Sequence, residues 1–200
     1  MVEKNKLLRE LKKEARGNGV PIMSDKGIDF LTTFILKNKI NSVLEIGTAV
    51  GFSAISMALV NPNIKVVTIE RDEERYLEAV KNVKRFDLED RITCIFNDAL
   101  NVRLEDKFDL IFIDAAKGQN INFFEYFERN LDNHGFFITD NIEFHGYVSK
   151  DEEEIKSRNL RALVRKIKNY IEFLQTNPNY NTTFVSKGDG IAVTEKKEIG

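Results

Sequence analysis

The sequence predicts an α/β fold: a mostly parallel sheet of about seven strands with helices on both faces and a terminal antiparallel hairpin. Three observations support this. Short apolar runs alternate with helical stretches between residues 42 and 139, as in βα units on a sheet that is covered on both faces. Two further apolar runs flank Lys187-Gly188-Asp189-Gly190, a typical hairpin turn. Hydrophobic residues make up 42% of the 200 residues, enough for the core of a single domain over residues 1–200.

Two helices are expected in the first 37 residues. Apolar residues recur at helical spacing between Lys4 and Arg16, and Gly17-Asn18-Gly19 ends that pattern. A second helix is expected over Ser24–Lys37, with Ser24 as its N-cap.

The alternating elements of the sheet follow from residue 38 onward. Strands are predicted at Ser42–Ile46, Lys65–Glu70, Ile92–Phe96, Phe108–Asp114 and Gly135–Thr139. Helices between them are predicted at Phe52–Leu59, Glu74–Phe86 and Asn122–Asn130. The chain is then expected to form a long helix over Glu154–Leu174 and hairpin strands over Asn181–Val185 and Ile191–Thr194.

Composition narrows the classes of function. No apolar run reaches the roughly 18–20 residues that a membrane-spanning helix needs, so no membrane partner is expected. The single cysteine allows no internal disulfide and fits a reducing cytoplasm. The formal charge is −2, from 30 basic and 32 acidic side chains. This balance argues against a nucleic-acid partner, which usually requires a basic excess, unless the basic residues are concentrated locally.

Polar residues collect where the predicted strands end, which is where open parallel sheets bind ligands. The first turn contains Gly47 and Gly51 but lacks the G-x-G-x-x-G spacing of a dinucleotide site. Glu70 is placed to accept hydrogen bonds from ribose hydroxyls, and Asp98-Ala99 to contact an adenine edge. The pattern fits an adenosine ligand without phosphates, such as S-adenosylmethionine (SAM), whose cationic groups suit acidic surroundings. The glycines taken alone are equally typical of a tight strand–helix turn.

A second group, Asp114, Asp140 and Asn141, offers hard oxygen ligands at neighbouring strand ends. Such ligands suit Mg²⁺ or Ca²⁺, and the chain has no Cys/His set that would attract zinc. Asp140-Asn141 taken alone is more often a capping or turn pair. Lys117 is either a solvated loop lysine or a base beside the metal.

Several segments resemble the metal-dependent, SAM-dependent O-methyltransferases, a family that includes catechol and caffeoyl-CoA enzymes. They are Glu45–Ser53, Phe108–Gly118 and Ile138–Asn141. Within this family the chain most resembles the bacterial enzymes that methylate 5-hydroxyuridine in tRNA. That likeness involves Pro21–Met23, Thr68–Arg71 to Asp90–Ile92, Asp114–Gln119 with Asn122–Phe124, and Val185–Ala192.

The resemblance implies a Rossmann-like SAM-dependent methyltransferase fold in which helices within residues 1–37 cover the SAM site. It implies metal ligation of Mg²⁺ or Mn²⁺ by Asp114, Asp140 and Asn141, with Asp114 and Lys117 as catalytic residues and Lys117 as the general base. It also implies a homodimer. The expected SAM-binding residues, with Asp98 taken from the strand ends, are Met23, Glu45, Gly47, Thr48, Ser53, Glu70, Asp98, Ala99, Asp114 and Ala116.

Basic residues are unevenly distributed. After the acidic run Asp151–Glu154, the segment from Lys156 to Lys168 holds six basic residues and no acid. Three of them, Arg158, Arg161 and Arg165, are spaced to share one helix face, which either is a solvated face or contacts phosphates of a tRNA anticodon loop.

Phe144 and His145 follow the expected metal ligands, where a substrate-facing loop is expected. A flipped-out wobble base could stack on Phe144, and His145 is equally consistent with an ordinary loop histidine.

The function that these features predict is methylation of 5-hydroxyuridine at the tRNA wobble position, giving 5-methoxyuridine. Its 5-hydroxyl and 4-carbonyl are vicinal oxygens, like those of a catechol. One alternative is a small-molecule methyltransferase of the catechol or caffeoyl-CoA type. A non-catalytic SAM- or nucleotide-binding module would not need the metal-ligand triplet, and an NAD-linked dehydrogenase lacks its glycine fingerprint.

Overall fold

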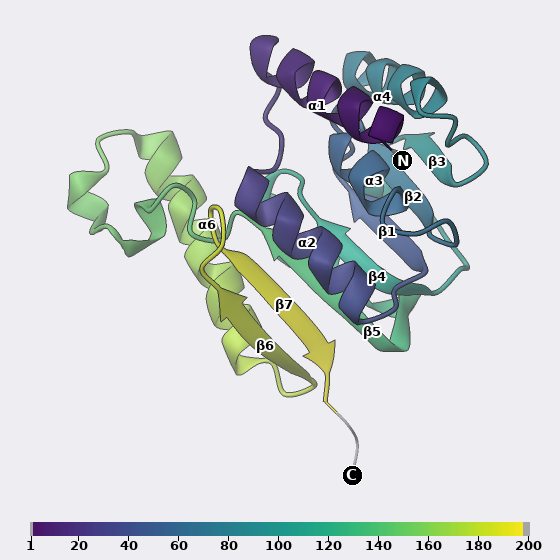
Figure 1. The fold of residues 1–200 in the computed structure, drawn as a ribbon. Helices are drawn as coiled ribbons and strands as arrows, with labels where there is room; N and C mark the ends of the chain where they lie inside the picture. Colours follow the sequence, from purple (N-terminus) through teal and green to yellow (C-terminus); the bar gives the residue numbers. More distant parts are fainter. Residues whose placement is uncertain (1, 198–200) are drawn as a thin grey trace.

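The computed structural model describes residues 2–197 and contains a seven-stranded sheet in the order β3-β2-β1-β4-β5-β7-β6 (Figure 1). The strands are β1 (Ser42–Ile46), β2 (Lys65–Glu70), β3 (Ile92–Phe96), β4 (Phe108–Ile113), β5 (Leu131–Asp140), β6 (Tyr180–Val185) and β7 (Ile191–Lys196). Strands β1 to β5 pair in parallel, and β7 lies between β5 and β6, antiparallel to both. The predicted mostly parallel sheet with a terminal antiparallel hairpin is therefore confirmed.

Helices cover the two faces of this sheet. They are α1 (Val2–Gly17), α2 (Asp25–Lys37), α3 (Phe52–Ala58), α4 (Glu73–Arg85), α5 (Asn120–Phe127) and α6 (Arg158–Thr176). Helices α1 to α4 pack on one face, as Figure 1 shows, and α5 and α6 pack on the other. Side chains of one strand alternate between these two cores: Leu110 and Phe112 of β4 face α1 to α4, and Ile111 and Ile113 face α5 and α6.

The first strands begin and end as predicted, but the long helix does not. It begins at Arg158 instead of Glu154, because Ser157 caps it: the Ser157 hydroxyl accepts a hydrogen bond from the Leu160 amide at 3.3 Å. The acidic residues before it form a separate 3₁₀ turn, Glu152–Glu154. The helix before β5 begins two residues earlier than predicted and gives way at Glu128 to a 3₁₀ turn, after which β5 begins at Leu131.

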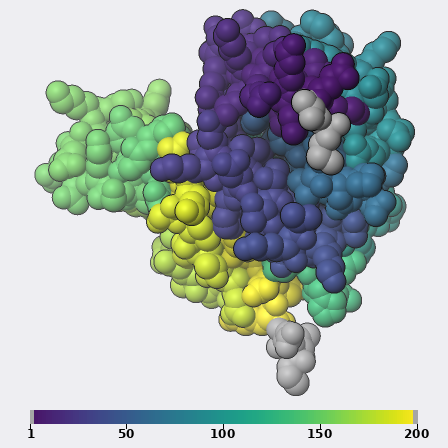
Figure 2. All heavy atoms as spheres, in the orientation of Figure 1, coloured from purple at the N-terminus to yellow at the C-terminus, as the bar shows by residue number. Residues whose placement is uncertain are grey.

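Residues 141–157, between β5 and α6, project from the body of the molecule as a lobe (green at the left of Figure 1, and standing clear in Figure 2). Its start contains three consecutive residues in the left-handed region: Phe144 (φ 45°), His145 (φ 53°) and Gly146 (φ 77°). For non-glycine residues this conformation is uncommon. Across residues 2–197, none of the helices is both long and apolar enough to cross a membrane.

Candidate functional site

A cavity of about 410 Å³ opens beyond the carboxyl ends of the parallel strands, where the strand order reverses between β1 and β4. This is the place at which open α/β sheets bind ligands, and the volume suits a small-molecule ligand. The predicted residues that line it are Met23, Gly47, Thr48, Ser53, Glu70, Asp98, Ala99, Asp114, Ala116, Lys117, Asp140, Asn141 and His145. The other predicted residues lie outside the lining: Glu45, Phe144, Arg158, Arg161 and Arg165.

Gly47 allows the ends of β1 and β4 to approach each other at the cavity. Its φ is +100°, and a β-carbon there would lie 2.4 Å from the backbone oxygen of Asp114. Any side chain at this position would therefore collide with backbone while also adopting a disfavoured conformation. Gly51, the N-cap residue of α3, also has a positive φ of 83°. The glycines are thus required by the turn itself, and they also leave the β1 end open to a ligand.

Glu70 closes one end of the cavity at the carboxyl end of β2. Its Oε2 accepts a hydrogen bond from the Ala49 amide at 2.8 Å, and its Oε1 accepts from the amides of Arg71 and Asp72, both at 3.0 Å. These bonds fix the carboxylate while leaving lone pairs for a ligand hydroxyl. Nearby, Asp98 Oδ2 lies 3.9 Å from the Arg71 guanidinium. This end of the cavity can accept hydrogen bonds from a sugar and from a base.

Glu45 lies beneath the cavity floor and does not line it. Its side chain is fully buried and accepts hydrogen bonds from the hydroxyls of Ser53 and Thr68, both at 2.5 Å. Thr68 is in turn 2.6 Å from the Thr48 hydroxyl, which does reach the cavity. Burial raises the pKa of the Glu45 carboxyl from 4.5 to about 8. Glu45 is therefore connected to the cavity through these hydroxyls, and its contact with SAM stays a prediction.

Asp114, Asp140 and Asn141 meet at the other end of the cavity. Asp140 is 7% exposed, and burial together with the charge of Asp114 raises the pKa of its carboxyl to about 7. The Asn141 Oδ1 atom is buried and has no hydrogen-bond partner within residues 2–197. Two repelling carboxyl groups beside an orphaned amide oxygen form a donor set that a hard divalent cation would satisfy. These residues therefore fit the metal that the sequence predicts.

Lys117 reaches into the same end. It begins a short 3₁₀ turn, Lys117–Gln119, and its Nζ lies 2.7 Å from Asp114 Oδ1. The Lys117 side chain is only 13% exposed. The structure therefore places this ammonium beside the oxygen donors, and not in solvent as a lone loop lysine would be.

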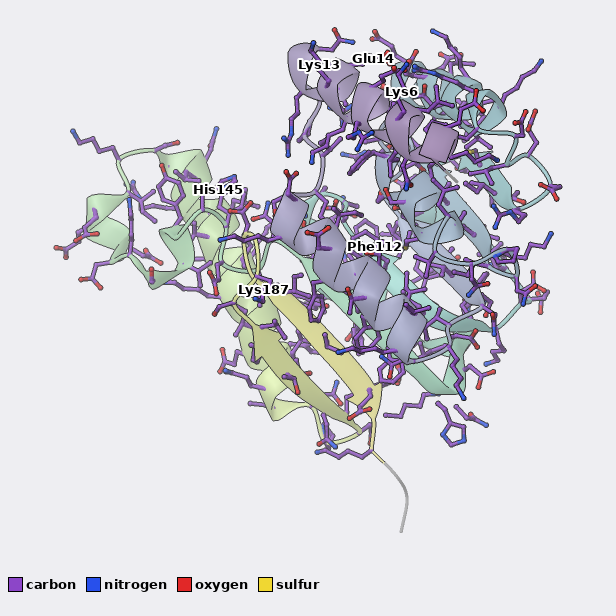
Figure 3. All side chains as sticks on the ribbon, viewed as in Figure 1. Lys6, Lys13, Glu14, Phe112, His145 and Lys187 are labelled. Carbon is purple, nitrogen blue, oxygen red and sulfur yellow. The ribbon has the colours of Figure 1, made fainter. Side chains whose placement is uncertain are left out.

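The turn between β6 and β7 completes the rim. The Asp189 carbonyl accepts a hydrogen bond from the Glu143 amide at 2.9 Å, and Asp189 Oδ1 lies 3.0 Å from His145 Nδ1. His145 and Asp189 both line the cavity. Figure 3 labels His145 on the loop after β5 and Lys187 on this turn. The C-terminal hairpin thereby holds the start of the lobe against the cavity.

Two of the three arginines of the predicted stripe pair with residues of the lobe, and their contact with RNA stays a prediction. Arg161 Nη1 donates hydrogen bonds to the carbonyls of Ile155 (2.5 Å) and Lys156 (3.2 Å), and Arg165 Nε pairs with Glu152 Oε1 at 2.9 Å. These two side chains therefore fasten the lobe to α6. Arg158 is exposed at the start of the helix, away from the cavity lining. Phe144 also lies outside the lining, although its ring centroid is 5.5 Å from that of His145.

Several lining residues were not predicted from the sequence. They are Pro21, Ile22, Ser24, Ile46, Ala49, Phe52, Ile69, Arg71, Arg75, Asn97, Ala115, Phe123 and Asp189. Arg71 and Asn97 directly follow strands β2 and β3, so the strand-end rule could have found them. Asp189 gave no such signal, because its position depends on the hairpin folding back onto the lobe.

Comparison with known proteins agrees with this geometry. A family model described as O-methyltransferase matches residues 1–197. A structure from Staphylococcus aureus, provisionally assigned as a caffeoyl-CoA O-methyltransferase, is 38% identical, with a TM-score of 0.90 over 95% of this chain and 92% of that one. An O-methyltransferase from Bacillus cereus in complex with SAH is 26% identical, with a TM-score of 0.81 over 96% and 91% of the two chains. An Arabidopsis thaliana protein with the same provisional caffeoyl-CoA assignment is 30% identical over 96% of this chain and 87% of its own.

Proposed function

The chain belongs to the O-methyltransferase family, and from this premise we propose that it transfers the SAM methyl group to a hydroxyl with a second oxygen on the neighbouring carbon. One observation carries the proposal. A single cavity has hydrogen-bond acceptors for an adenosine at the Glu70–Asp98 end and three hard oxygen donors at the other end. A module that only binds a nucleoside would have no use for the second set.

The protein's own residues divide the work between binding and proton handling. The Glu70 carboxylate, held by hydrogen bonds from three backbone amides, accepts hydrogen bonds from the ribose hydroxyls. Asp114, Asp140 and Asn141 hold a divalent cation such as Mg²⁺ or Mn²⁺. When bound, that cation would lower the pKa of the acceptor hydroxyl and orient the two vicinal oxygens. Lys117, as a neutral amine, takes up the hydroxyl proton, or, as the ammonium held 2.7 Å from Asp114 Oδ1, it stabilises the resulting oxyanion.

Small catechol-type molecules are the first substrate class we propose. The relatives assigned as caffeoyl-CoA O-methyltransferases favour this class. Arg161 and Arg165, two of the three arginines that could contact an extended phosphate backbone, also pair with residues of the lobe. The acidic segment Asp151–Glu154 on the lobe would repel such a backbone further.

5-Hydroxyuridine at the tRNA wobble position, with an anticodon loop as partner, is the second candidate. Two aromatic rings beside the lining residue His145 favour it: the Phe144 ring centroid lies 5.5 Å from that of His145 and 6.2 Å from that of Tyr147. Unpaired RNA bases are recognised by stacking on such side chains. Mass spectrometry of tRNA nucleosides from a strain lacking the gene tests this substrate. Loss of 5-methoxyuridine with accumulation of 5-hydroxyuridine supports it, and an unchanged profile rejects it.

The proposed reaction itself is tested with a matched pair of phenols. Purified protein with labelled SAM and Mg²⁺ should methylate catechol, whose hydroxyls are vicinal. Resorcinol, whose hydroxyls are separated by one more carbon, should be methylated at least tenfold more slowly. EDTA should abolish the activity and added Mg²⁺ should restore it. Equal rates on the two phenols, or full activity in EDTA, would contradict the proposed role of Asp114, Asp140 and Asn141.

A further inference from the structure

The basic side chains of α6 differ in whether the protein itself uses their charge. Arg161 and Arg165 hold the lobe, and Lys168 Nζ donates a hydrogen bond to the Lys150 carbonyl at 3.3 Å. Lys166 stands between them, and within residues 2–197 it has neither an ion pair nor a hydrogen bond. Among residues 2–197, Lys166 and the exposed Arg158 are the basic residues of α6 without such a partner, and Lys166 is the one that lies beside the Lys117–Gln119 turn.

Lys166 extends across Gly118, next to the candidate active site. A β-carbon on Gly118 would lie 3.2 Å from Lys166 Cδ and 3.5 Å from Lys166 Nζ. Any other residue at this position would crowd the lysine side chain, which would have to shift by a few tenths of an ångström. Gly118 directly follows Lys117, whose Nζ lies 2.7 Å from Asp114 Oδ1. The missing side chain at Gly118 thus leaves room for the Lys166 side chain beside the residue that follows Lys117.

The position of Lys166 is well supported by the helix that carries it. Val164 and Ile167, on either side of it in sequence, are each 1% exposed, and α6 packs on the Lys117–Gln119 turn. The helix therefore cannot rotate Lys166 away without exposing its apolar face. Only the flexible side chain has to adjust when a ligand arrives.

We propose that Lys166 binds an anionic group, a phosphate or a carboxylate, carried by the methyl acceptor outside the ring that bears its two vicinal oxygens. The inference rests on the proposed function and specifies its substrate class further. An ammonium has three donors and no acceptor, so it binds an oxyanion more strongly than it binds a neutral oxygen. Because Lys166 does not line the cavity, it selects the substrate and does not take part in methyl transfer.

The test compares acceptors that differ only in charge. Wild type and Lys166→Ala are assayed with catechol and 3,4-dihydroxybenzoate, and with 5-hydroxyuridine and its 5′-monophosphate. The substitution should raise the KM of the charged member of a pair about three- to tenfold, leaving kcat and the neutral member unchanged. Lys166→Arg should restore the KM, and Lys168→Ala, which removes a charge that the protein already uses, should not reproduce the effect.

The outcomes show which anion Lys166 binds, and whether it binds one at all. A KM effect confined to the monophosphate assigns Lys166 to phosphate, one confined to 3,4-dihydroxybenzoate assigns it to carboxylate, and an effect on both assigns it to anions in general. Equal changes for the charged and neutral members, or no change, would overturn the role of Lys166. A wild-type protein inactive on all four acceptors would instead refute the proposed function, and this inference with it.

Discussion

Replacing Glu45 with glutamine should remove a pH-dependent loss of stability from the ligand-free protein. The folded protein raises the pKa of this buried carboxyl from 4.5 to about 8. Below pH 4.5 both the folded and the unfolded chain bind the proton, so Glu45 contributes no pH dependence there. Between pH 4.5 and pH 8 only the folded state retains the proton on Glu45, so the free energy of unfolding falls as pH rises. The fall ends above pH 8.

The size of the effect follows from the same two values. At roughly 1.4 kcal/mol for each pH unit of difference, the loss reaches up to about 5 kcal/mol at pH 8. This figure is an upper limit, because the hydrogen bonds that the Ser53 and Thr68 hydroxyls donate to this carboxyl favour its ionised form. The glutamine variant does not titrate, so its stability relative to wild type should increase by a few kcal/mol between pH 5 and pH 8.

Urea unfolding followed by circular dichroism at pH 5, 6.5 and 8 measures this difference. All other titrating groups are common to both proteins and cancel in the comparison. Glu74→Gln, a change to an exposed carboxyl on α4, serves as the matched control and should show no such trend. A stability difference between Glu45→Gln and wild type that stays constant over the three pH values would refute the reasoning.

Three further substitutions test other parts of the structure. Gly47→Ala should lower the free energy of unfolding by about 2–4 kcal/mol and abolish SAM binding in calorimetry, because the new β-carbon meets the Asp114 backbone; unimpaired SAM binding would contradict the geometry. Asn141→Ala should weaken Mg²⁺ binding about tenfold or more. Its Tm should fall only by the few degrees that an alanine at a φ of 64° costs, because the Asn141 amide oxygen has no partner within residues 2–197; a much larger fall in Tm would indicate a structural role instead. Ser157→Ala should cost about 1 kcal/mol in urea unfolding through loss of the α6 cap, and an unchanged midpoint would place the start of the helix elsewhere.

The sequence predicted the sheet well because its signals are local. Buried parallel strands appear as short apolar runs, and β1, β2 and β3 have the predicted bounds. The start of α6 was wrong for a physical reason. Glu152–Glu154 favour the first turn of a helix, but Ser157 offers a better cap, and the helix begins after it.

Most of the candidate site also followed from one rule, that residues just beyond parallel strands meet at one edge. That rule could not place Glu45, which stands within β1 and shares the side of Val43, a residue of the core beneath α1 to α4. The strand-end rule also could not show that Arg161 and Arg165 pair with other residues of the protein, because their partners belong to the lobe. The partners of a long charged side chain depend on which surfaces the fold brings near it, and these surfaces cannot be read from the local sequence.

The position of β7 also bears on how the protein can assemble. This strand comes last in the chain but lies inside the sheet, between β5 and β6. During synthesis, β5 therefore presents an unpaired edge until residues 191–196 leave the ribosome, and β6 has no neighbour to join. The turn that brings Asp189 to His145 forms in the same step. A nascent chain interrupted before that point would have most of the predicted cofactor-binding residues but an incomplete rim and an unpaired strand edge, so quality control at this stage would act on an aggregation-prone species.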